Sequence, residues 1–379
     1  MLNYIQDIVT RFGGRYFGSE QEKNAQYFTA GILNEYCDKV AVEEFHSALE
    51  SHFQSLKIFS LAYVAVLVLL RINIPVAAIL GIMNTVLFLL HFVMYRHFIV
   101  DKLFPNKPSW NVIGDIEPLQ EAKRTIIVAG HIDSVKEFKW WYKLKQKGAA
   151  LTVLSGFVIS FLGIYALLHL FIHVWWFYHI WLLFVLLTPM LVVFFNMHGN
   201  KVVDGASDNL TGVAMAVEAA KVFSVNRLQH TRVRVISFGA EEAGLRGAWA
   251  YAQQHKEQLL KENAFLLNID TIKDLEHLTI VTAELNTLVF YKKAFIERVQ
   301  RSFEAMGVKY KKLPVGVGAS DGSAFHMNGL PVATIIGMDS GNLDPCYHTR
   351  LDTVDCINPE ALEATKKVMI HFIETWDKE

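Results

Sequence analysis

The stretch TIIVAGHIDSV, residues 125–135, joins an apolar run rich in β-branched residues to a histidine and an aspartate. Similar apolar runs recur at residues 232–238, 264–269 and 332–336, and a short alternating run lies at residues 40–45. Helix-like stretches are expected between and around them, at residues 20–37, 210–223, 245–260, 288–306 and 359–376. Strands that alternate with helices indicate an α/β fold with a largely parallel central sheet.

Two long apolar blocks interrupt this pattern. Hydrophobic residues make up 52% of the 379-residue chain and charged residues only 19%, which is too apolar for an ordinary soluble enzyme. Residues 58–71 and 75–95 form two helical spans, and residues 148–196 contain no Asp, Glu, Lys or Arg and divide near residues 169–176. Aromatic clusters flank these spans, as is typical of membrane interfaces. We therefore predict four transmembrane helices in two hairpins, 51–107 and 137–199.

The polar remainder, residues 1–50, 108–136 and 200–379, is predicted to form a single domain on one side of a lipid bilayer. Lys and Arg are concentrated next to the spans on the side of this domain, whereas the hairpin tips carry little beyond Arg71. This bias places the domain on the cytoplasmic side. A net charge of −1 without a long basic run argues against a nucleic-acid partner.

The cysteines and the N-terminus carry little information about the compartment. Three cysteines suit a reducing compartment, although Cys346 and Cys356 are able to pair. The first twenty residues lack the features of a secretory signal, so we expect residue 1 to begin a folded part.

Acids and histidines follow the predicted strands. His131 and Asp133 follow the first run, Glu241 and Glu242 the second, and Asp270 the third. Ligands of open α/β sheets bind beyond the carboxyl ends of the strands, so these groups are expected to converge. Two further groups, Asp208 at a helix start and His348 in a loop, complete the set.

Five of these side chains suit a pair of zinc ions, because zinc prefers imidazole and carboxylate ligands. We predict that His131, Asp208, Glu242, Asp270 and His348 hold two zinc ions, with Asp208 as the bridging carboxylate. The metal pair would activate a water molecule as the nucleophile. Glu241 is predicted to be the general base, and Asp133 to accept the second ring N–H of His131. A nucleotide-binding loop at residues 205–212 is rejected, because the required Lys and Ser/Thr are missing.

Eight segments resemble the motifs of one known family, the di-zinc aminopeptidases, which also includes glutamate carboxypeptidase II and the glutaminyl cyclases. These segments are RxxGSE (15–20), NVIG (111–114), GHIDSV (130–135), GASDNLTGVA (205–214), FGAEEAGLRGA (238–248), NID (268–270), SDGSAF (320–325) and YHTRLDT (347–353).

The resemblance implies a three-layer α/β/α sandwich around a mixed sheet, and removal of single residues from peptide ends. It also implies that His131, Asp208 and Asp270 bind one zinc, and that Asp208, Glu242 and His348 bind the other. One departure is that Gly322 stands where relatives often carry histidine. The predicted function is thus a membrane-embedded zinc exopeptidase, most simply an aminopeptidase acting on peptides.

Three alternatives stay open. A glutaminyl cyclase-like acyltransferase uses a similar scaffold with one zinc, and the full set of five ligands argues against it. A non-catalytic receptor or assembly protein on this scaffold would be expected to have lost ligands. A transporter would need charged groups within the spans, which carry no Asp, Glu, Lys or Arg away from their edges.

Overall fold

The computed structural model describes residues 1–97, 99–339 and 341–378, and this part of the chain divides into two compact units. The first unit is assembled from Met1–Leu49, Asn106–Glu137 and Lys201–Glu379. The second unit consists of Glu50–Pro105 and Phe138–Asn200. Strands β4 (Lys136–Phe138) and β5 (His198–Val202), which pair with each other, contain two of the points where the chain changes unit.

The first unit is built on a mixed sheet with nine strands among the described residues. Its four central strands, β6, β3, β7 and β11, run parallel, whereas β1 and β2 join antiparallel at one side and β8 joins antiparallel at the other. In spatial order the strands are β1 (Lys39–Ser47), β2 (Lys107–Ile116), β6 (Thr231–Phe238), β3 (Arg124–His131), β7 (Phe265–Ile272), β11 (Val332–Gly337), β8 (Thr279–Glu284) and β10 (Lys311–Val315), with β9 (Val289–Phe290) paired to β8. The predicted mixed, largely parallel sheet is confirmed.

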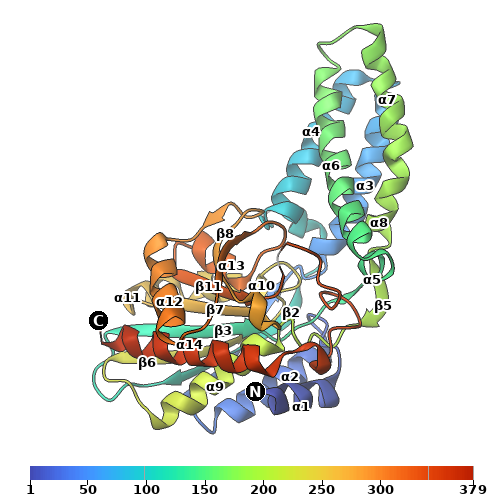
Figure 1. Cartoon of the computed structure of the whole chain (residues 1–379). Coiled ribbons are helices and arrows are strands. Elements are labelled where there is room, and N and C mark those ends of the chain that lie inside the picture. The colour runs from blue at the N-terminus through green and yellow to red at the C-terminus, as the bar shows by residue number, and fades with distance from the viewer. Residues whose placement is uncertain (98, 340, 379) are drawn as a thin grey trace. The chain divides into compact units, whose positions relative to one another are not determined.

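Helices cover both faces of this sheet (Figure 1). Phe265 on β7 packs against Phe372 and Trp376 of α14 and against Phe295 of α12, which defines one face. Phe238 at the end of β6 packs against Phe325 of α13 and Tyr251 of α10 on the other. The helices of the unit are α1 (Leu2–Phe12), α2 (Glu20–Leu33), α9 (Leu210–Val225), α10 (Arg246–Gln254), α11 (Lys256–Lys261), α12 (Lys293–Ala305), α13 (Asp321–Met327) and α14 (Pro359–Asp377).

Several predicted bounds were wrong where tertiary contacts or turns override the helical pattern. The helix expected over 245–260 is interrupted at His255, whose ring contacts Glu43 on β1. The helix expected from residue 288 begins only at Lys293, because Val289–Phe290 pairs with β8. The helix expected to reach Cys37 ends at Leu33 in a turn.

The second unit contains four helices, within the described part of the chain, that are long and apolar enough to cross a membrane: Ser51–Leu69, Ile74–Val93, Gln146–Leu168 and Trp175–Phe195. They correspond to α3 (Ser51–Leu69), to α4 (Ile74–Phe88) with the π-helical η1 (Leu89–Val93), to α6 (Gln146–Leu168), and to α7 (Trp175–Leu187) with η3 (Thr188–Leu191) and α8 (Val192–Phe195). The short helix α5 (Lys139–Leu144) precedes α6.

Close backbone contact and polar side chains hold these helices together. A Cβ atom added at Gly163 of α6 would lie 2.4 Å from the carbonyl oxygen of Gly81 on α4, so the two helices touch through small residues. Asn84 donates to the carbonyl of Phe59 at 3.1 Å, and Tyr63 donates to that of Phe184 at 2.7 Å. Such hydrogen bonds between helices are typical of membrane bundles.

Candidate metal centre

The carboxyl ends of three adjacent parallel strands supply most of the candidate site. His131 is the last residue of β3, Glu241 and Glu242 follow β6, and Asp270 lies near the end of β7. Asp208 precedes α9, where Asn209 caps the helix by accepting the N–H of Gly212 at 2.9 Å. Parallel strands present their carboxyl ends at one edge, which explains why residues from distant parts of the sequence meet here.

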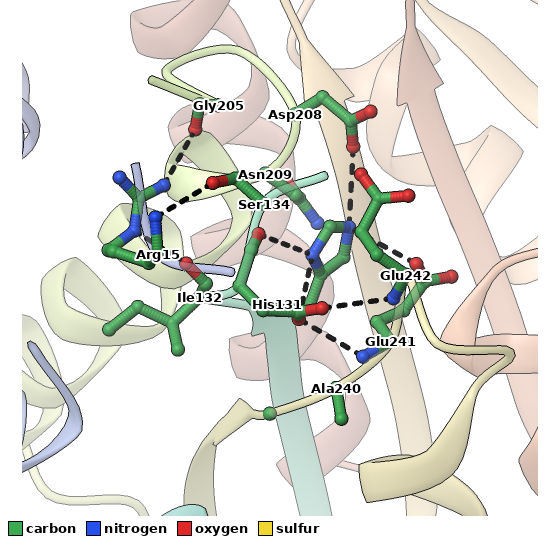
Figure 2. A network of polar contacts seen from close by, with 12 residues as sticks. Arg15, His131, Ile132, Ser134, Gly205, Asp208, Asn209, Ala240, Glu241 and Glu242 are labelled. Carbon is green, nitrogen blue, oxygen red and sulfur yellow. Dashed lines mark hydrogen bonds and ion pairs between the residues drawn. The ribbon is translucent and has the colours of Figure 1, made fainter. Parts of the chain in front are cut away.

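The structure brings the five predicted ligands together as two groups of three that share Asp208. One group is His131, Asp208 and Asp270, and the other is Asp208, Glu242 and His348; all of them are buried. Asp208 Oδ1 lies 3.3 Å from His131 Nε2, and Asp208 Oδ2 lies 3.2 Å from His348 Nε2. The two oxygens of this one carboxylate thus face different histidines. Figure 2 shows His131, Asp208, Glu241 and Glu242 gathered around this point.

These separations fit zinc. Two donors bound to one tetrahedral zinc at its usual bond length of about 2.0–2.1 Å lie about 3.4 Å apart. Besides the two contacts of Asp208, His348 Nε2 lies 3.2 Å from Glu242 Oε2. The donor set of imidazoles and carboxylates is the one that zinc takes, so the residues suit two zinc ions with Asp208 between them.

The electrostatics of the group also favour cations. Burial raises the pKa of Asp270 to about 7 and the pKa of Glu242 above its ordinary value. Burial would lower the pKa of His348, but the carboxylates of Glu242 and Asp208 outweigh it and raise that pKa to about 10. Full ionisation of Asp208, Glu242 and Asp270 would place more negative charge in this buried site than two imidazoles can balance. Divalent cations would balance it, because a buried charge is stable only when it is paired or coordinates a metal.

Glu241, the predicted base, lies beside the two groups and belongs to neither. Its Oε2 is 3.7 Å from His131 Nε2, and burial raises its pKa well above the ordinary value of a glutamate. A buried carboxyl group of raised pKa beside an activated water is suited to accept a proton and release it again. The role of Glu241 as general base stays a prediction.

Asp133 contacts both histidine and base. Its carboxylate lies 3.4 Å from His131 Nδ1, which also approaches the backbone oxygen of Asp133 at 3.3 Å. The same carboxylate accepts the backbone N–H groups of Glu241 and Glu242, each at 3.0 Å. The contact between Asp133 and His131 was predicted from the sequence, whereas the two hydrogen bonds to the backbone of Glu241 and Glu242 were not.

Two buried residues that sequence reasoning did not single out hold the ligand loops. Arg15 donates to the backbone oxygens of Ile132 at 2.6 Å, Asp204 at 2.7 Å and Gly205 at 3.1 Å, so it joins the loop after β3 to the loop before α9 (Figure 2). Asp352 accepts the N–H and the hydroxyl of Ser207 at 2.7 and 2.6 Å. Arg15 lies in the RxxGSE motif and Asp352 in the YHTRLDT motif, and this membership was the only indication in the sequence that the two residues are important.

A further carboxyl group, Asp321, is fully buried near the base, and neither of its oxygens has a hydrogen-bond partner among the described residues. Burial raises the pKa of Asp321 well above the ordinary value, and the charge of Asp321 contributes to the raised pKa of Glu241. The next residue is Gly322, where a Cβ atom would lie 2.3 Å from Thr334 Oγ1 and 2.7 Å from the Tyr291 hydroxyl. The hydroxyl of Tyr291, which donates to Glu284 at 2.6 Å, therefore takes the space that a side chain at this position would need.

The loop that carries His348 is fastened at both ends. Cys346 and Cys356 form a disulfide bond, a pairing that the sequence left open. The ring of Tyr347 stacks on that of His348 with centroids 3.9 Å apart. Arg350 forms a bidentate ion pair with Glu137, with both N–O distances at 2.7 Å. These contacts fix the position of His348.

The fold is shared with solved structures of zinc aminopeptidases and glutaminyl cyclases. A zinc aminopeptidase structure from Bacillus subtilis superposes with a TM-score of 0.60 at 16% identity, covering 99% of this chain and 94% of that one. A glutaminyl cyclase from an Acidobacteriales bacterium gives a TM-score of 0.59 at 12% identity, covering 100% and 93%. At these identities the likeness shows the fold alone.

Residues 190–373, just under half of the chain, match the family described as "Peptidase family M28". The chain is 31% identical over 163 residues to "Aminopeptidase YwaD" of Bacillus subtilis (strain 168), which is 42% of this chain and 35% of that protein. It is 28% identical over 207 residues to "Leupeptin-inactivating enzyme 1" of Streptomyces exfoliatus, 49% and 45% of the two chains. The chain thus spans about a third to a half of the length of these relatives. The family resemblance predicted from the motifs is confirmed.

Proposed function

We propose that this protein is a zinc-dependent exopeptidase, an aminopeptidase, that binds two zinc ions per chain and hydrolyses peptide substrates. The observation that carries the proposal is the pair of three-residue groups that share the two oxygens of Asp208. In this proposal His131, Asp208 and Asp270 hold one ion, and Asp208, Glu242 and His348 hold the other. The peptidase domain is the first unit.

Zinc, when bound, supplies a Lewis acid that makes a water molecule more acidic and polarises the substrate carbonyl. Glu241 accepts the proton of the attacking water and transfers it to the amine that leaves. Asp133 keeps His131 in one tautomer and holds the backbone of Glu241 in place, so the base and the ligand move as a unit. Arg15 and Asp352 position the two loops without contacting the substrate.

We further propose that the second unit lies in a membrane as two helical hairpins, residues 51–107 and 137–199. Large apolar side chains of its helices are exposed along their length, among them Leu61, Ile79, Phe161 and Leu186. Trp175 and Trp176, both exposed, stand at the start of α7, where aromatic residues anchor a helix at the interface. An apolar surface of this extent is a liability in water and is satisfied in lipid.

The proposed orientation, with the peptidase domain in the cytoplasm, rests on the distribution of Lys and Arg. The Cys346–Cys356 bond opposes it, because disulfides persist mainly in oxidising compartments. A reporter fused after the C-terminal helix α14 decides between them. Fluorescence of a fused cytoplasmic fluorescent protein supports the proposal, and activity of a fused periplasmic phosphatase contradicts it.

The function is tested on the full chain purified in detergent, with a panel of fluorogenic aminoacyl substrates and matched substrates whose amino terminus is blocked. We expect turnover of the free amino termini only, loss of turnover after chelation, and recovery on adding zinc. Turnover that survives complete metal removal would contradict the proposal.

The likeness to glutaminyl cyclases makes cyclisation of N-terminal glutamine the second candidate. The same panel includes a glutaminyl peptide, and the product is identified by mass. Loss of ammonia without chain shortening would favour the cyclase, and release of a free amino acid favours the peptidase.

A further inference from the structure

A second group of potential metal ligands lies in the second unit, on the segment that follows α4. His91, His97 and Asp101 each place one ligand atom within 4.8 Å of the others. His91 belongs to the π-helical turn η1, and Asp101 belongs to the 3₁₀ turn η2 (Val100–Leu103). Single π-helical turns are rare and frequently mark functional sites. None of these residues belongs to the peptidase site.

The two histidines of this group lie close to each other. Their Nδ1 atoms lie 3.4 Å apart. Two nitrogens bound to one tetrahedral zinc lie about 3.4 Å apart, so this separation suits a shared ion as well as the direct contact between the two rings. In the first unit, the Nε2 atoms of His131 and His348 lie at a similar distance, 3.2–3.3 Å, from the carboxylate oxygens of Asp208.

The surroundings orient the three side chains. Ser51 at the start of α3 donates its hydroxyl to Asp101 Oδ1 at 2.6 Å, which fixes the carboxylate. The ring of His52 stacks on Phe92, with centroids 4.7 Å apart, and packs edge-on against His97 at 5.6 Å. His91 is only 1% exposed. Outer contacts of this kind tune a ligand set for a metal.

We propose that His91, His97 and Asp101 form a third metal site, for a divalent transition metal such as zinc. Two imidazoles and one carboxylate suit zinc and its neighbours in the first transition row. The ion would hold the segment from His91 to Asp101 together, and the hydrogen bond from Ser51 would connect this segment to the start of the first hairpin. The site is independent of the proposed peptidase function.

The test counts metal ions on the full chain in detergent. The protein is stripped with a chelator, titrated with Zn²⁺ alone, desalted and measured by elemental analysis. We expect three zinc ions per chain in the wild type and two in His97→Gln. The matched control is His173→Gln, which changes an exposed histidine of the other hairpin and should retain three. Equal zinc content in the two variants would overturn the proposal.

A spectroscopic variant guards against loss of metal through misfolding. His97→Cys keeps a ligand at the position, so its Co²⁺ complex should show a thiolate-to-cobalt charge-transfer band. His173→Cys should not show it, and absence of the band from both variants would overturn the proposal. Counting zinc in an Asp208→Ala background separates this site from the peptidase centre, because the third ion should remain when the centre is lost. In this background, Ser51→Ala should lower the affinity of the site for the remaining zinc ion roughly tenfold.

Discussion

The carboxylate of Asp133 accepts the backbone N–H of Glu241 at 3.0 Å, and so joins the loop after β3 to the residue proposed as the catalytic base. Asp133→Asn replaces one of the two accepting oxygens with an NH2 group, so one of the backbone N–H groups of Glu241 and Glu242 loses its acceptor. We expect zinc affinity to fall about 10–100-fold, as for other outer contacts of metal ligands. Competition with a fluorescent zinc chelator measures it. Asp7→Asn, at an exposed position, should leave the affinity unchanged.

Replacing the proposed base separates chemistry from metal binding. Glu241→Gln keeps the size of the side chain but cannot accept a proton, so turnover should fall about 10²–10⁴-fold while two zinc ions stay at the centre. Asp208→Ala, in contrast, should lose those ions, because both groups of three share this residue. Glu257→Gln on α11 is the exposed control. Near-normal turnover in Glu241→Gln would exclude this residue as the base.

Arg15 is a buried cation whose partners are backbone oxygens of two loops. Burial lowers its pKa to about 10, and the nearby charge of Asp133 opposes that effect. Arg15→Lys keeps the charge but cannot reach several carbonyls at once, so we expect a loss of about 2–4 kcal/mol in unfolding free energy. Denaturant unfolding followed by Trp fluorescence measures it against Arg11→Lys, an exposed change on α1. Equal stability of the two variants would argue against the loop-joining role.

One ion pair away from the centre predicts a pH effect on stability. His255 Nε2 lies 2.9 Å from Glu43 Oε2, and this hydrogen bond raises the pKa of His255 above its ordinary value of 6.5, against the opposing effect of partial burial. A raised pKa means that the folded state binds the proton more tightly. The stabilisation is therefore complete below pH 6.5 and is lost as pH rises through the folded pKa.

His255→Gln should remove about 0.5 kcal/mol at pH 6 and almost nothing at pH 9, since exposed pairs contribute little. Unfolding curves at the two pH values give the difference. His46→Gln, at an exposed position on β1, serves as the control. A loss that is the same at both pH values would show that packing, rather than charge, makes the contribution.

Four of the five proposed ligands were predictable because they follow an apolar strand or precede a helix, and parallel strands end at one edge, whereas His348 lies in a loop. The contacts that support the ligand loops were not predictable from the sequence. Arg15 binds carbonyls more than a hundred residues away, and nothing local in the sequence indicates such partners. Strand β2 was not expected, although its NVIG segment was quoted, because its antiparallel neighbours β1 and β6 are distant in sequence. The site at His91, His97 and Asp101 was missed since the histidine and the arginine nearby read only as breaks in an apolar run.

The first unit is discontinuous, and this sets an order of events during biosynthesis. The ribosome makes His131 before the second hairpin, and Asp208, Glu242, Asp270 and His348 after it. A newly made chain that has released only its first 200 residues carries a single one of these five groups. Under the proposed function, zinc binding at Asp208 is consequently a late event, because a chain that stops after 200 residues lacks four of the five proposed ligands.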